Sequence, residues 1–160
     1  MVYLDQAATS FPKLDVVKQA VMDALEVAGN ANRSSNMDSS RLIFEARRNI
    51  ARFFGLSDFH RVILNGGNTE SLNTCIKGIL KEKDHVITTY AEHNSVLRPL
   101  YELEEKGVIS LTICSPYLKD IKNHIRNNTR MVIMTHSSNV TGEIFDVDLI
   151  GKYCKESDIL

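Results

Sequence analysis

Residues 85–114 read HVITTYAEHNSVLRPLYELEEKGVISLTIC and contain two short β-rich runs, at residues 85–90 and 108–114. Between these runs, residues 96–106 are expected to form a helix. A strand, a helix and a second strand in this order are typical of a βαβ unit, whose strands are parallel. The segment therefore predicts an α/β fold.

The same alternation continues on both sides of this segment. Further strands are expected at residues 61–65 and 130–135, with helices at residues 69–80, 118–127 and 146–157. The pattern predicts a three-layer α/β/α architecture around a mainly parallel sheet. Residues 158–160 read as the start of another strand, an unusual place for a compact domain to end, so we expect truncation. In the helix at 69–80, Cys75 lies on the apolar side, and its burial is expected.

Two helices are expected before this core. Residues 15–28 carry apolar side chains at helical spacing, and Gly29 with Asn30 should end that helix. A second helix runs from about residue 39 or 40 to 54, with Gly55 as its C-cap and arginines forming a solvated or interface face. We therefore expect an N-terminal arm with helices at residues 1–55 and a βαβ core at residues 56–160.

Composition excludes several classes of function. The 160 residues are 43% hydrophobic and 24% charged, as in ordinary globular domains, and the net charge is -1. Without a basic stripe, nucleic-acid binding is not expected, and neither is a membrane span or a signal peptide. Three widely spaced cysteines fit reduced thiols in a cytoplasmic protein, and they have no metal-ligand spacing.

A glycine turn is the first candidate site. Gly66-Gly67-Asn68-Thr69 follows the strand expected at 61–65 and opens a helix, where free N–H groups and the helix dipole favour an anion. The Asn68 and Thr69 side chains add hydrogen-bond donors. The lysine of nucleotide-binding loops is missing. The alternative is a simple glycine turn with Thr69 as an N-cap.

Two further loops follow strands of the same sheet, so all three loops should meet at one edge. His93 can stack on a planar ring or move a proton, or it can be a capping or surface group. Asn139 can donate to a phenolate or carboxylate oxygen, or it can satisfy its own backbone.

These motifs together resemble the class V aminotransferase family of pyridoxal-phosphate enzymes, particularly its cysteine desulfurase and selenocysteine lyase branch. The resemblance rests on four segments in family order: Tyr3–Ser10 followed by Pro12, Asn68-Thr69-Glu70 with Asn73, Glu92-His93-Asn94, and Thr135–Gly142. It covers nearly the whole chain.

The resemblance implies a role for each matching residue. Asn68 and Thr69 would bind the phosphate of pyridoxal 5'-phosphate, His93 would stack on its ring as the catalytic histidine, and Asn139 would hydrogen-bond its phenolic oxygen. Ala7 and Ala8 would approach the substrate. The segment at residues 32–36 differs from the loop of many relatives, so a substrate role for Arg33 is not carried over.

The resemblance also implies that residues 1–160 are the N-terminal part of the cofactor-binding large domain. The Schiff-base lysine, the aspartate for the ring nitrogen and the sulfur-accepting cysteine would lie beyond residue 160, so this chain alone should be inactive. Lys152 and Lys155 are expected to be surface lysines.

The activity that the resemblance implies is removal of sulfur or selenium from cysteine or selenocysteine to give alanine, in a homodimer with a possible sulfur-acceptor protein. Alternatives are another class V aminotransferase or lyase, a non-catalytic scaffold, or an α/β domain that binds another phosphate ligand.

Overall fold

The computed structural model describes residues 2–28 and 37–160 of the chain. It divides into two compact units, with the boundary between Asn65 and Gly66. The expected helix stop at Gly29 and Asn30 and the segment at residues 32–36 with Arg33 lie outside the described residues.

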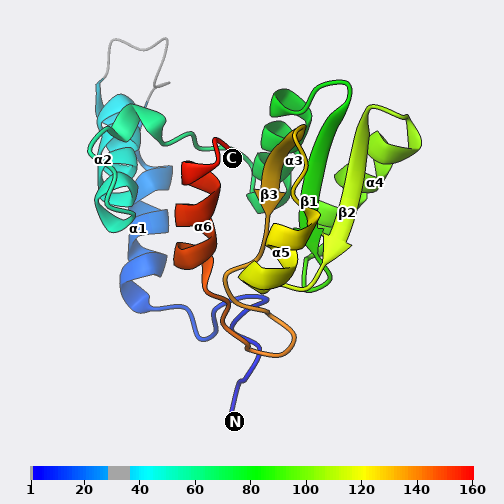
Figure 1. The fold of residues 1–160 in the computed structure, drawn as a ribbon. Coiled ribbons are helices and arrows are strands. Elements are labelled where there is room, and N and C mark those ends of the chain that lie inside the picture. The colour runs from blue at the N-terminus through cyan, green and yellow to red at the C-terminus, as the bar shows by residue number, and fades with distance from the viewer. Residues whose placement is uncertain (1, 29–36) are drawn as a thin grey trace. The chain divides into compact units, whose positions relative to one another are not determined.

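The N-terminal unit contains α1 (Asp15–Leu25), α2 (Asp38–Phe53) and a 3₁₀ turn, η1 (Phe59–Arg61) (Figure 1). The capping role expected of Gly55 is confirmed. Its φ of 67° is in the left-handed region that favours glycine, and the Leu56 N–H donates back to the Ala51 carbonyl at 2.8 Å.

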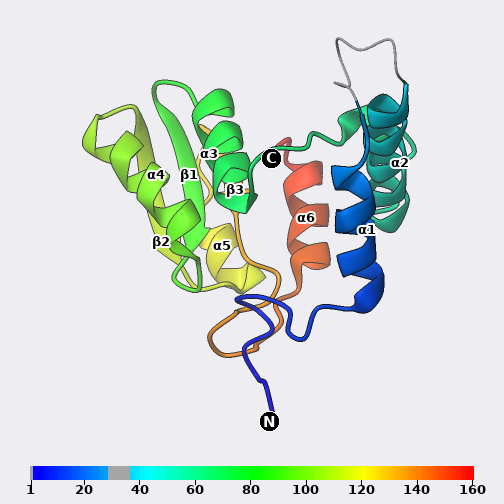
Figure 2. The ribbon, with the colours of Figure 1, turned by 180° about the vertical axis from the view of Figure 1, so that it is seen from behind.

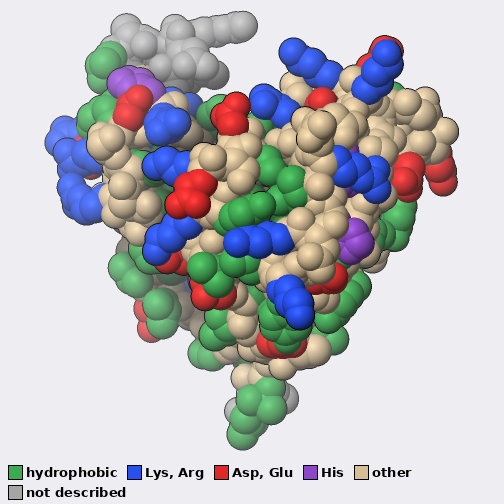
Figure 3. Space-filling view, in the orientation of Figure 1, with side chains coloured by type: hydrophobic (Ala, Val, Ile, Leu, Met, Phe, Trp, Pro, Cys, Tyr) green, Lys and Arg blue, Asp and Glu red, His purple; other side chains and the backbone are tan. Residues whose placement is uncertain are grey.

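Little apolar surface is buried in the N-terminal unit. Phe44 of α2 contacts Phe59 of η1 edge-to-face, with ring centroids 4.8 Å apart, and Ala51 is buried. By contrast, α1 has no buried residue. Lys and Arg side chains gather over α2 in the space-filling view (Figure 3), which agrees with the expected charged face.

The C-terminal unit is built on a sheet of three parallel strands, β1 (Asp84–Thr89), β2 (Ile109–Cys114) and β3 (Thr129–Ile133). Their order is β2-β1-β3, so β1 is central. Five of its six residues are buried, which explains why this run is almost continuously apolar or β-branched. The loops after β1 and β3 therefore leave adjacent positions at the carboxyl edge of the sheet.

Helices cover both faces of this sheet, so the three-layer α/β/α prediction is confirmed. On one face, Val86 packs with Ile76 of α3 (Asn68–Ile79) and Leu100 of α4 (Asn94–Glu105). On the other, Ile87 packs with Ile121 of α5 (Leu118–His124) and with α6 (Val147–Glu156). Figure 1 views the sheet from the α5 side, and Figure 2 from the side of α3 and α4. No helix within residues 2–28 and 37–160 is long and apolar enough to cross a membrane.

The prediction of a strand at residues 61–65 is wrong. Arg61 ends the 3₁₀ turn, and residues 62–65 are irregular, with Ile63 78% exposed. A β-rich composition favours a strand only where a neighbouring strand offers hydrogen bonds and a face to pack on. The sheet of the described residues contains only β1, β2 and β3.

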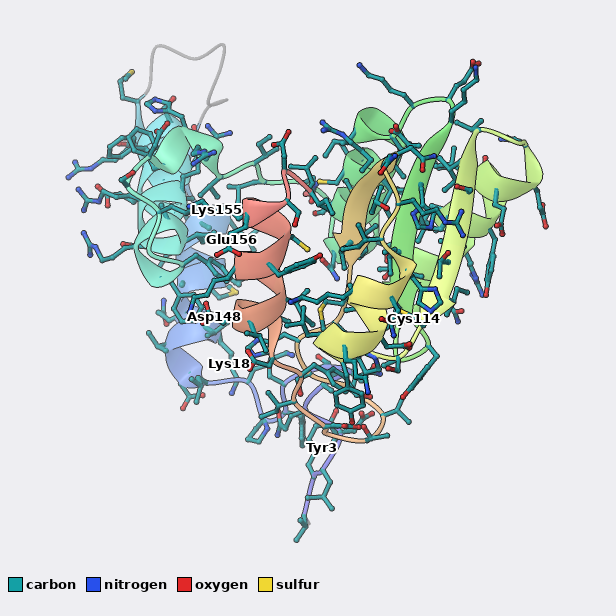
Figure 4. All side chains as sticks on the ribbon, in the orientation of Figure 1. Tyr3, Lys18, Cys114, Asp148, Lys155 and Glu156 are labelled. Carbon is teal, nitrogen blue, oxygen red and sulfur yellow. The ribbon has the colours of Figure 1, made fainter. Side chains whose placement is uncertain are left out.

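The expected burial of Cys75 is also wrong, since its side chain is exposed. The buried stripe of α3 centres on Ile76, and Cys75 lies at its edge. Cys114 and Cys154 are buried free thiols, and Figure 4 labels Cys114 at the end of β2.

Residues 158–160 behave in part as the expected strand start. No strand is assigned to them, but the Leu160 N–H donates to the Arg130 carbonyl at 3.1 Å, and the Leu160 carbonyl accepts from the Val132 N–H at 2.8 Å. Bonds to residues two apart on one partner are the pattern of a parallel ladder. Leu160 thus pairs with β3 on the side away from β1.

Candidate active site

The start of α3 presents free donors, as expected for an anion site. Gly67 is its N-cap, with a φ of 149° that favours glycine, and no side chain caps the first turn. Thr69 is therefore inside the first turn rather than at the N-cap. Asn68 and Thr69 are exposed there. The Glu70 carboxylate accepts a hydrogen bond from the Gly66 N–H at 2.7 Å, so this end of the helix also carries a negative charge.

His93 is the N-cap of α4, which confirms the alternative prediction that it is a capping group. Its Nδ1 accepts the backbone N–H of Ser95 at 3.1 Å and lies 2.8 Å from the Ser95 hydroxyl oxygen. Because Nδ1 acts as an acceptor, the neutral ring carries its proton on Nε2. The side chain is exposed. Capping thus fixes the ring while leaving Nε2 available to a ligand.

Thr69 and His93 line the same cavity, of about 280 Å³, between the starts of α3 and α4. Arg98 and Glu102 of α4 also line it. Hydrogen bonds from Lys106 and Lys77 lower the pKa of Glu102 to about 2, so its negative charge is balanced by two ammonium groups. The cavity therefore combines helix-start donors, an imidazole and a guanidinium.

Asn139 does not line this cavity. It is exposed in the loop after β3, and its turn is held by Ser138, whose hydroxyl accepts the N–H groups of Val140 and Thr141, each at 3.2 Å. The expected role of Asn139 at the cofactor stays a prediction.

Glu92 has contacts that the sequence alone did not reveal. Its carboxylate accepts hydrogen bonds from the Thr89 hydroxyl, at 3.0 Å, and from the Thr135 backbone N–H. Burial raises its pKa, opposed by these two bonds and by nearby His93. A second cavity of about 280 Å³ is lined by Glu92 and Ser138. Two features of the sequence pointed to it: Glu92 is an acidic residue in the turn that follows a buried strand, and Thr89 is three residues before it.

Two of the thiols in the C-terminal unit, Cys114 and Cys154, are not activated nucleophiles, and Lys152 and Lys155 are surface lysines. Burial raises the pKa of Cys114 to about 11 and also raises the pKa of Cys154, so both remain protonated at neutral pH. Lys152 and Lys155 lie exposed on α6, as expected, and Figure 4 labels Lys155 on that helix. Lys152 pairs with Asp148 at 2.6 Å.

Ala7 and Ala8 belong to the N-terminal unit, where both are exposed. They lie in a turn in which the Ala8 and Thr9 N–H groups donate to the Asp5 carbonyl, at 3.3 and 3.4 Å. Their expected approach to a substrate stays a prediction.

The sequence model of the Aminotransferase class-V family matches residues 2–160. The chain belongs to the class V aminotransferase family. This is a family of pyridoxal-phosphate-dependent enzymes. Its curated members include the cysteine desulfurase IscS of Buchnera aphidicola subsp. Schizaphis graminum, which is 36% identical over 99% of this chain and 42% of its own length. The IscS of Plasmodium falciparum is 31% identical over 99% of the chain and 31% of its own length.

Solved structures resemble this chain over nearly its whole length. A protein named SspA, solved in complex with cysteine, has a TM-score of 0.85 and 26% identity over 99% of this chain and 49% of its own. The apo cysteine desulfurase of Thermococcus onnurineus NA1 has a TM-score of 0.84 and 27% identity over 99% of this chain and 42% of its own. The chain thus spans less than half the length of these relatives.

Proposed function

We propose that this chain forms the N-terminal part of the large domain of a cysteine desulfurase-like enzyme and contributes the phosphate and ring contacts for pyridoxal 5'-phosphate. The observation that carries the proposal is the cavity shared by Thr69 and His93. The relatives named cysteine desulfurases, and the one solved with cysteine, support cysteine as the substrate. Residues 1–55 would supply the arm and helices, and residues 56–160 the core.

The residues around the cavity fit this cofactor. A phosphate dianion needs several N–H donors and positive charge, which the uncapped first turn of α3 and Arg98 offer. The hydroxyl of Thr69 adds a donor, and the exposed imidazole of His93 offers a planar face. The Glu70 carboxylate opposes the phosphate, so we expect it to turn away from Gly66 when an anion binds.

Each of the site residues would have one task in binding the cofactor or moving a proton. When bound, pyridoxal phosphate supplies an electron sink for negative charge at the substrate α-carbon. Asn68 and Thr69 would bind its phosphate, and Asn139 its phenolic oxygen. His93 would exchange a proton through Nε2, because Nδ1 is occupied by Ser95. The cysteine that accepts sulfur is not assigned to Cys114 or Cys154, which are buried and protonated.

The proposal is tested by titrating the chain with pyridoxamine 5'-phosphate and following the absorbance and fluorescence of the ligand. This form of the cofactor has an amine in place of the aldehyde, so it does not form Schiff bases with surface lysines. We expect saturable binding that weakens at least tenfold, or about 1.4 kcal/mol, in His93→Ala and in Thr69→Val.

His124→Ala is the matched control, because it removes a partly exposed imidazole at the end of α5 that does not line the cavity. Its affinity should equal that of the unaltered chain. Equal affinities for His93→Ala and the control would contradict the ring contact. Equal binding of pyridoxamine 5'-phosphate and inorganic phosphate would favour a domain for another phosphate ligand, and absence of binding would favour a non-catalytic scaffold.

A further inference from the structure

Glu92 lies in the turn between β1 and α4, directly before His93. Its side chain is partly buried, and it carries a carboxylate at the carboxyl edge of the sheet. Capping of α4 does not require it, because His93 is the N-cap and accepts from Ser95. The presence of a partly buried carboxylate at this position therefore needs an explanation other than helix capping.

The contacts of Glu92 join two strands. One carboxylate oxygen, Oε1, accepts both the hydroxyl of Thr89, the last residue of β1, and the backbone N–H of Thr135, two residues beyond β3. β1 and β3 are neighbours in the sheet. The carboxylate thus ties the loop that carries His93 to the loop that carries Ser138 and Asn139.

Burying this carboxylate works against folding, as the raised pKa of Glu92 shows. A charged acceptor makes shorter and stronger hydrogen bonds than a neutral one, so it holds the two loops more firmly than an amide or hydroxyl would. His93 lines one cavity of this edge, and Glu92 and Ser138 line another. A fixed distance between the loops matters only if one ligand contacts both.

We propose that Glu92 is a positioning residue whose carboxylate sets the His93 loop against the Ser138–Asn139 loop, so that both reach one bound cofactor. This rests on the proposed function and extends it to a residue that touches neither the phosphate nor the ring. Thr89 and Thr135 supply the two donors, one from a side chain and one from the backbone.

The test uses the whole chain, labelled with ¹⁵N and ¹³C for NMR. In Glu92→Ala we expect the Thr135 amide to exchange with solvent at least tenfold faster, and pyridoxamine 5'-phosphate to bind at least tenfold more weakly. Glu92→Gln keeps an acceptor oxygen but loses the charge, so its affinity should lie between those of the unaltered chain and Glu92→Ala. Glu105→Ala, at the exposed end of α4, is the matched control and should change neither quantity.

The response of the His93 ring to the ligand separates positioning from general loss of structure. Its ring signals should move on adding pyridoxamine 5'-phosphate to the unaltered chain and to Glu92→Gln, but much less in Glu92→Ala. If Glu92→Ala does not fold, Thr89→Val replaces it, since it removes one donor and keeps the shape of the side chain. Weaker binding in Thr89→Val then supports the proposal, and unchanged binding overturns it.

The outcomes distinguish the two proposals. Absence of pyridoxamine 5'-phosphate binding in the unaltered chain contradicts the proposed function. Binding in the unaltered chain with unchanged Thr135 exchange and unchanged affinity in Glu92→Ala overturns the positioning role alone.

Discussion

His85 shows how one buried side chain makes the stability of this fold depend on pH. It is fully buried on β1, with Nδ1 2.8 Å from the Thr129 hydroxyl and Nε2 2.9 Å from the Thr112 hydroxyl. Burial, followed by the charges of Arg126 and His124, lowers its pKa from 6.5 to about 4. The imidazole is therefore neutral in the folded protein at neutral pH.

We expect the chain to lose stability as the pH falls from about 6.5 to about 4. In that window the unfolded chain takes up a proton at His85 and the folded chain does not, so acid favours unfolding. The contribution is complete above the unfolded pKa, and its loss is on the order of 3 kcal/mol. Urea unfolding at pH 7 and pH 4.5 measures it, with His85→Gln as the variant that cannot titrate. Equal pH dependence of both proteins would contradict this prediction.

Single residues also show which features of the site could be predicted from the sequence and which could not. The exposed His93 and Thr69 were identified because polar groups after strands and at helix starts follow local rules. The link from Glu92 to Thr135 joins positions 43 residues apart, so it depends on which strands are neighbours. Cys75 was misplaced because it lies one residue from Ile76, at the boundary of the buried stripe.

At the scale of elements, the central strand should carry most of the stability. We expect Ile87→Ala to lower the free energy of unfolding by about 2–5 kcal/mol, because Ile87 is fully buried on β1 against α5 and α6. Ile113→Ala on the edge strand β2 is the control. Its side chain is 40% exposed, so its loss should cost less than about 1.5 kcal/mol. Chemical denaturation measures both, and equal losses would mean that the layer of α5 and α6 is not tightly packed.

Elements defined by their own periodicity were predicted well. The helices at 69–80 and 146–157 agree with α3 and α6 to within one residue, because an amphipathic helix satisfies its own backbone. The strand at residues 61–65 failed because a strand needs a partner that local sequence does not specify. Leu160 shows the converse, since the neighbouring strand β3 gives this residue the hydrogen bonds of a parallel ladder.

At the scale of the whole molecule, we expect self-association through α2. Its stripe of Leu42, Ile43, Ile50 and Phe53 is exposed, with Phe53 at 82%, and contiguous apolar surface of this kind marks an interface. The proposed occupant is a second copy of this chain, as the family resemblance implies.

Light scattering over a range of concentrations should give a mass that rises above 18.0 kDa toward twice that value. Phe53→Asp places a charge within the proposed contact, where its desolvation opposes association, so this variant should remain at the monomer mass. Val140→Asp is the matched control, because Val140 is 85% exposed and belongs to the loop after β3, in the C-terminal unit. A constant monomer mass for the unaltered chain would contradict the prediction, and dimers of both variants would place the interface elsewhere than α2.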